Sequence, residues 1–118
     1  MPSVFLICDY LHLLICDNLR FEGYEVIEAR DGLEALDKAE QNSPDLIILD
    51  IGLPMLDGWD VCQRLKNNPM TKRIPIIILS ARAQDADIKR GSEYGANAYL
   101  TKPCHPRELM SKVKSLIH

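Results

Sequence analysis

The chain has 118 residues, the size of one ordinary domain, and 47% of them are hydrophobic. Its 14 Lys and Arg and 17 Asp and Glu give a net charge of −3. The two signs alternate along the chain, which argues against direct nucleic-acid binding. No apolar run approaches the roughly 18 residues of a membrane helix. We therefore expect one soluble globular domain that spans residues 1–118.

The four cysteines are far apart in the sequence and form no CxxC pair. They are Cys8, Cys16, Cys62 and Cys104. Zinc sites and redox dithiols show closer spacings, so we interpret these residues as reduced thiols, which favours a cytoplasmic protein. Cys16 and Cys62 fall on the apolar faces of predicted helices and are expected to be packing residues.

In chain order, the first half predicts three strands and two helices. An apolar run at 4–8 predicts a buried strand, and a helix follows over about 11–21 and ends near Gly23. A weaker strand covers 25–29. Asp31, with Glu34 three residues later, resembles a helix capping box. We expect Leu33, Leu36 and Ala39 on the inner face of that helix, before a buried strand at 46–49.

The second half continues the alternation of helix and strand. Gly58 opens a helix whose apolar side is Val61, Cys62 and Leu65, and Asn68-Pro69 breaks it. A buried strand at 75–79 and a helix over about 84–94, stopped by Gly95, come next. A weaker strand covers 98–100. The last helix runs from about 106 to the end, and its inward residues are Leu109, Met110, Val113, Leu116 and Ile117.

Five repeats of strand and then helix predict an α/β fold. The strongest strands are rich in Ile, Val and Leu and do not alternate with polar residues, which is typical of a parallel sheet covered on both faces. A doubly wound sheet of five strands satisfies the right-handed crossovers. In such folds the functional site lies beyond the carboxyl ends of the strands.

Polar groups follow four of the predicted strands at that edge: Asp9, Asp50, Ser80 and Lys102. Two carboxylates side by side repel each other, and a divalent cation relieves the repulsion. Magnesium prefers oxygen ligands and binds through one or two carboxylates plus phosphate. A carboxylate nucleophile, a metal site, a cation and a hydroxyl are the parts that aspartyl-phosphate chemistry requires. Each residue alone has an ordinary structural explanation; the joint placement outweighs it.

These segments resemble a known family. Residues 46–58, LIILDIGLPMLDG, resemble the phosphoacceptor segment of bacterial response-regulator receivers. Residues 78–81, ILSA, and 95–103, GANAYLTKP, match the family's two later signatures in order and spacing. The resemblance covers essentially the whole chain. It implies a flavodoxin-like (βα)5 fold with strand order 2-1-3-4-5, in a phosphoacceptor switch of a two-component or phosphorelay pathway and not a conventional enzyme.

The resemblance also implies roles for single residues. Asp50 would receive the phosphoryl group from a phosphohistidine on a sensor histidine kinase or a histidine phosphotransfer protein. Asp9, Asp50 and the backbone carbonyl of Gly52 would bind Mg²⁺. Ser80 and Lys102 would bind the phosphoryl group.

Tyr99 would swing inward when Ser80 moves, and the face around 84–118 would then change. A downstream protein or an output domain would read this face. Whether phosphorylation drives homodimerisation is left open. Trp59 is expected to serve as an optical reporter.

One site position departs from the family pattern. Receivers carry two consecutive acids at the end of the first strand, whereas this chain has Cys8-Asp9. We expect weaker magnesium binding and slower phosphorylation as a result. The alternative is a degenerate, phosphorylation-independent adaptor. A redox role for Cys8 is disfavoured because nearby carboxylates oppose its thiolate. An aspartate-nucleophile phosphatase is set aside because Gly52 occupies the position of its general acid.

Overall fold

The computed structural model describes residues 3–7, 12–50, 58–80, 89, 93–101 and 105–117. Its five strands form one parallel sheet in the order β2-β1-β3-β4-β5, which is the flavodoxin-like order predicted from the sequence. The strands are β1 (Ser3–Ile7), β2 (Glu25–Ala29), β3 (Leu46–Asp50), β4 (Ile76–Ser80) and β5 (Ala98–Thr101).

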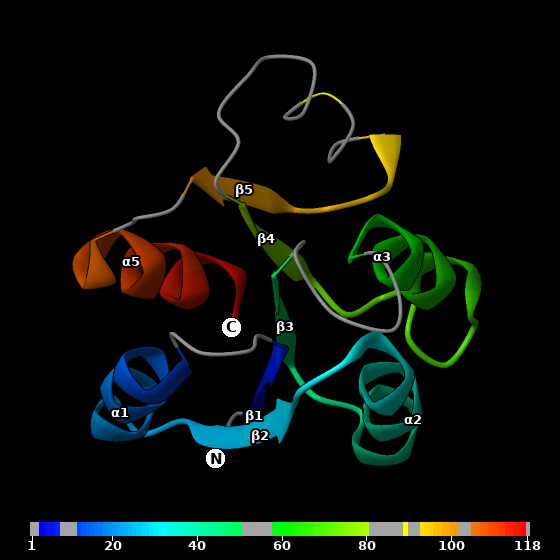
Figure 1. Ribbon diagram of the computed structural model, residues 1–118. Helices are drawn as coiled ribbons and strands as arrows, with labels where there is room; N and C mark the ends of the chain where they lie inside the picture. The colour runs from blue at the N-terminus through cyan, green and yellow to red at the C-terminus, as the bar shows by residue number, and fades with distance from the viewer. Residues whose placement is uncertain are drawn as a thin grey trace.

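Helices cover both faces of this sheet. Figure 1 shows α1 and α5 on one face and α2 and α3 on the other. These helices are α1 (His12–Phe21), α2 (Gly32–Asn42), α3 (Gly58–Asn67) and α5 (Pro106–Leu116). Because both faces are covered, β3 and β4 are buried at every position, which explains their unbroken apolar sequences.

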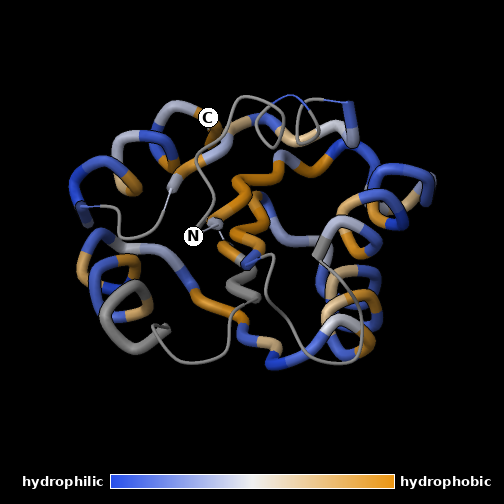
Figure 2. Tube along the Cα trace, turned by 45° about the horizontal axis from the view of Figure 1, so that its top comes forward, coloured by the Kyte–Doolittle hydropathy of each residue, from blue (hydrophilic) through white to orange (hydrophobic). Residues whose placement is uncertain are grey.

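Two apolar clusters form the core, one on each face. In β3, Ile47 and Leu49 belong to the cluster that packs with α2 and α3, whereas Leu46 and Ile48 belong to the cluster that packs with α1 and α5. This division follows the alternation of side chains along a strand. Figure 2 shows the same arrangement, with the most hydrophobic chain at the centre and hydrophilic positions on the outer helices.

The turn residues identified in the sequence end and begin the helices as expected. The Asp31 side chain accepts a hydrogen bond from the backbone N–H of Glu34 at 2.9 Å, which makes Asp31 the N-cap of α2. Gly23 and Gly95 have φ angles of +94° and +90°, so each occupies backbone space that other residues rarely adopt.

One core assignment from the sequence was wrong. Leu33 was expected on the inner face of α2, but 51% of its surface is exposed. The buried stripe of α2 consists of Gly32, Ala35 and Ala39, with Leu36 packed partly against it. Leu33 lies about 100° around the helix from Gly32, outside this stripe. Small residues therefore form the inner face of α2, and the apolar pattern overestimated how wide that face is.

Most of the other expectations for the elements were confirmed. The apolar side of α3 is buried as expected, and so are Leu109, Met110 and Val113 on α5. The helix expected over 84–94 lies mostly outside the described residues, of which 89 and 93 are helical. None of the described helices is long and apolar enough to span a bilayer.

Candidate functional site

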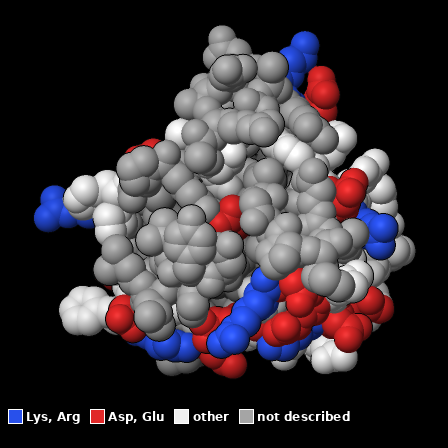
Figure 3. Space-filling model, in the orientation of Figure 1, with Lys and Arg blue, Asp and Glu red and all other residues white. Residues whose placement is uncertain are grey.

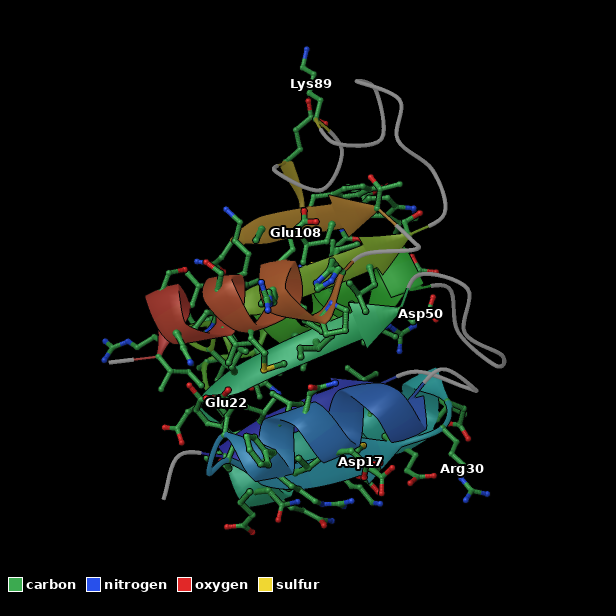
Figure 4. All side chains as sticks on the ribbon, turned by 90° about the vertical axis from the view of Figure 1, so that its left-hand side faces the viewer. Asp17, Glu22, Arg30, Asp50, Lys89 and Glu108 are labelled. Carbon is green, nitrogen blue, oxygen red and sulfur yellow. The ribbon has the colours of Figure 1, made fainter. Side chains whose placement is uncertain are left out.

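Asp50 is the last residue of β3, between β1 and β4 in the sheet. It is only 5% exposed, although it carries a carboxylate. Figure 4 shows Asp50 at the same edge of the sheet as Arg30, while Glu22 lies at the opposite edge. Four apolar residues in β3 hold Asp50 in this position. A buried carboxylate is costly unless charged or hydrogen-bonding partners compensate it, so the surroundings of Asp50 must supply such partners.

Ser80 ends the neighbouring strand at the same edge. In the parallel pairing of β3 and β4, Asp50 lies opposite Leu79, so Ser80 is one residue further along. Ser80 is 6% exposed and pairs with Thr101 of β5. The sheet thus brings the two predicted site residues Asp50 and Ser80 to adjacent strand ends, both shielded from solvent.

Tyr99 lies on the same face of the sheet as Ser80. Tyr99 pairs with Ile78, and Ile78 and Ser80 are two residues apart on β4. Residues paired across parallel strands share a face, as do residues i and i+2 of one strand. This is the face covered by α2 and α3, and Tyr99 packs partly buried against the core there. Asp50 pairs with Leu79 and therefore lies on the opposite face of the sheet.

The ring of Tyr99 stacks on the indole of Trp59 from α3. Their centroids are 6.3 Å apart and their planes differ by 20°. Tyr94 meets the same indole edge-on, at 5.6 Å and 90°. Both geometries belong to the favourable arrangements of aromatic pairs. The sequence analysis singled out Trp59 and Tyr99 for separate roles, but it did not predict that they are in contact. Tyr94 was not identified as a site residue.

Four of the predicted site positions lie outside the described residues: Cys8, Asp9, Gly52 and Lys102. Among the residues that the structure describes, no group of three or more His, Cys, Asp or Glu could hold a metal ion. Of the predicted magnesium ligands, only Asp50 is therefore placed by the structure, and its buried carboxylate is an oxygen donor of the kind that Mg²⁺ prefers.

The two described cysteines are buried, free thiols. Burial, followed by a 3.4 Å hydrogen bond from Cys16 Sγ to Oε1 of Glu28, raises the pKa of Cys16 from 9.0 to about 12. Burial raises the pKa of Cys62 to about 11. Because the thiolate is the reactive form, both residues are inert at neutral pH, which confirms that they are packing residues.

His105, which lies near the site in sequence, caps a helix. Its Nδ1 accepts a hydrogen bond from the backbone N–H of Arg107 at 3.1 Å, and His105 is the N-cap of α5 with Pro106 directly after it. A proline at the first helical position is a common helix start. In Figure 3, acidic and basic side chains lie intermingled over α1, β2 and α2.

Comparison with known proteins agrees with this geometry. The family model described as the response regulator receiver domain matches residues 10–114. The chain belongs to the response regulator receiver family. Receiver domains are regulatory domains of two-component signalling, where they interact with histidine kinases and output domains.

Curated relatives of this receiver are longer proteins. It is 47% identical over 100 residues to the alkaline phosphatase synthesis transcriptional regulatory protein PhoP of Bacillus subtilis, and the match covers 85% of this chain and 41% of PhoP. It is 40% identical to the DNA-binding dual master transcriptional regulator RpaA of Synechocystis, over 99% of this chain and 49% of RpaA. The receiver thus spans about half or less of these relatives.

Solved structures match the receiver over nearly its full length. The chemotaxis protein CheY4 of Vibrio cholerae has a TM-score of 0.91 at 28% identity, with 99% of both chains covered. The receiver domain of the sensor histidine kinase PA1611 from Pseudomonas aeruginosa has a TM-score of 0.89 at 32% identity, covering 98% of this chain and 96% of that one. The PA1611 receiver was crystallised with a magnesium ion coordinated in its active site cleft.

Proposed function

We propose that Asp50 is the phosphoacceptor of this receiver and takes its phosphoryl group from a phosphohistidine on a sensor histidine kinase or a histidine phosphotransfer protein. The main support is the position of Asp50. It is a buried carboxylate at the end of the central strand β3, next to the end of β4, where Ser80 lies. Its carboxylate oxygen attacks phosphorus, the bond to the histidine nitrogen breaks, and the histidine leaves with that electron pair.

Magnesium is the proposed cofactor. Asp9, Asp50 and the backbone carbonyl of Gly52 would hold the ion, which, when bound, neutralises charge on the phosphoryl oxygens. The magnesium in the PA1611 receiver supports this proposal by similarity. Asp9 follows the end of β1 by two residues, and β1 is the other neighbour of β3 in the sheet. Of this donor set, the described carboxylate of Asp50 suits the ion.

Three further residues are proposed to act on the phosphoryl group or to respond to it. Lys102 pairs with a phosphoryl oxygen, and Ser80 donates a hydrogen bond to another. Phosphorylation adds about −1.5 to −2 charges at neutral pH, and binding this charge draws Ser80 toward Asp50. Tyr99 then moves inward, and the face around 84–118 changes for a downstream protein or output domain. The location of Ser80 and Tyr99 on one face of the sheet supports this coupling.

The proposal for the whole chain is one receiver domain over residues 1–118 that does not itself bind nucleic acid. Any DNA binding, as in RpaA, would then belong to a separate output region. The phosphorylation-independent adaptor depends on Cys8, which lies outside the described residues, and no observation on the described residues favours it.

The test is intact mass after incubation with Mg²⁺ and acetyl phosphate. We expect a phosphoryl adduct on the unmodified chain, no adduct on Asp50→Ala and no adduct when the metal is chelated. Asp45→Ala is the matched control, because Asp45 is an exposed acid on the same chain segment. Cys8→Asp restores the second acid and should speed adduct formation. An adduct on Asp50→Ala would show that Asp50 is not the acceptor, and no adduct on either the unmodified chain or Cys8→Asp would refute the proposed activity.

A further inference from the structure

Helix α3 presents one stripe of side chains to residues 94–99. Trp59, Cys62 and Lys66 are spaced i, i+3 and i+7, so they lie along one side of the helix. Each of them contacts residues 94–99. We name these three residues the α3 stripe.

Two members of the α3 stripe fix the turn before β5. Cys62 Sγ donates a hydrogen bond to the backbone carbonyl of Tyr94 at 3.5 Å. The stem of Lys66 packs against Gly95 so closely that a Cβ on that glycine would lie 3.0 Å from Cγ of Lys66. The Lys66 ammonium group is itself held in place, because Nζ donates a hydrogen bond to the backbone carbonyl of Ile74 at 2.8 Å. The turn is therefore held against α3 on one side.

Asn97, the residue directly before β5, is held by β4. The backbone N–H of Asn97 donates to the carbonyl of Ile76 at 2.8 Å, and the N–H of Ile76 donates to Oδ1 of Asn97 at 3.1 Å. The backbone of Tyr99 itself pairs with Ile78 of β4, so Tyr99 can change position mainly by rotating its side chain. The rotation of the Tyr99 ring then depends on what that ring contacts.

Among the described residues, the Tyr99 ring stacks on the aromatic ring of Trp59. Trp59 is 4% exposed and belongs to the core, whereas Tyr99 is only partly buried. The indole is thus the more enclosed partner of the stack, and the phenol is the more exposed one. Tyr94 packs edge-on against the same indole and helps to keep it in place.

We propose that Trp59 is a positioning residue for Tyr99. Its indole stabilises the stacked position of the Tyr99 ring, and the ring leaves this position when Ser80 moves toward a phosphoryl group. This inference rests on the proposed function of Asp50. Trp59 of α3 thus joins Ser80 and Tyr99 in the proposed change of state. The strength of its stack on Tyr99 sets how readily the receiver changes state.

The chain contains a single tryptophan, so its indole emission reports on this position alone. We would record emission and intact mass together, with Mg²⁺ and acetyl phosphate, on the unmodified chain, Tyr99→Leu and Tyr24→Leu. Tyr24 is a matched control because it is also partly buried but packs against the core on the opposite face. We expect emission to change with adduct formation in the unmodified chain and in Tyr24→Leu. Tyr99→Leu should form the adduct without that change.

A second measurement tests the direction of the effect. Loss of the stack in Trp59→Leu should speed adduct formation by roughly 2- to 10-fold, the factor that corresponds to one aromatic pair. Trp59→Phe retains a ring at this position, so it should form the adduct more slowly than Trp59→Leu and at close to the rate of the unmodified chain. Circular dichroism of each variant establishes that it is folded, and the Tyr99 variant keeps the test valid if Trp59→Leu does not fold.

The outcomes separate this inference from the proposal on which it rests. An adduct on the unmodified chain with no emission change, or an equal emission change in Tyr99→Leu, overturns the role of Trp59 alone. Equal rates in Trp59→Leu and Trp59→Phe overturn it as well. The absence of an adduct in all variants overturns the proposed function and this inference together.

Discussion

The buried thiol of Cys16 should make the receiver less stable as the solution becomes alkaline. In the folded chain the pKa of Cys16 is raised from 9.0 to about 12 by burial and by its hydrogen bond to Glu28. Below about pH 9 the thiol is protonated in both states and contributes no pH dependence. Above that pH the unfolded chain ionises while the folded chain does not, so the free energy of unfolding falls until the pH reaches the folded pKa.

The size of the effect follows from the gap between the two pKa values. At about pH 10, one unit above the unfolded pKa, the unfolded chain gains on the order of 1 kcal/mol from ionising this thiol. The folded chain gains almost nothing at that pH, because its pKa is about 12. Cys62, with a pKa raised to about 11, contributes a loss of similar size.

The assay is urea unfolding of the unmodified chain and Cys16→Ala at neutral pH and at about pH 10, with reductant present. Cys16→Ala will be less stable at neutral pH because it leaves a small cavity. The informative quantity is the loss of stability between the two pH values, which should be smaller in Cys16→Ala by on the order of 1 kcal/mol. Equal losses in the two proteins would show that the thiol is not protected, and the physical argument for its inertness would fail.

Substitutions that test three further structural features are each measured by urea unfolding. Thr71→Val should cost about 1–3 kcal/mol, because the buried Thr71 hydroxyl donates to the carbonyl of Leu65 at 2.6 Å; a neutral result would show that this bond contributes nothing. Gly95→Ala should be more destabilising than Gly23→Ala. Both glycines have positive φ, but of the two only Gly95 has a side chain, that of Lys66, crowding the added methyl group. Equal losses of unfolding free energy in the two variants would contradict this close packing. Asp31→Ala should cost about 1 kcal/mol through loss of the α2 cap, whereas Asp31→Asn should retain most of the stability.

The parallel sheet and most element bounds could be predicted because burial on both faces leaves a clear signature, whereas the strand order was implied by the resemblance to response-regulator receivers. Runs such as 46–49 and 75–79 are apolar at every position, and the structure buries 46–49 and 76–79 completely. The inner face of α2 was misjudged at Leu33, because small residues can line a helix interface as well as large ones can. The apolar pattern does not encode how closely a helix approaches its sheet.

Within the site, the strand-end positions of Asp50 and Ser80 could be predicted, but contacts between distant segments could not. The stack of Trp59 on Tyr99 joins residues 40 positions apart, and it depends on how α3 lies across the sheet. Nothing in the local sequence of either segment specifies such a contact. The capping role of His105 was also missed, although the proline directly after it is a local sign of a helix start.

The most direct test of the account is chemical identification of the modified residue. After incubation with Mg²⁺ and acetyl phosphate, the receiver would be treated with borohydride, which reduces an aspartyl phosphate to homoserine and releases phosphate. Peptide sequencing by mass spectrometry should then find homoserine at position 50 and unmodified aspartate at position 45. Homoserine at any other aspartate, or phosphate retained on a serine, threonine or histidine, would contradict the assignment of Asp50 as the phosphoacceptor.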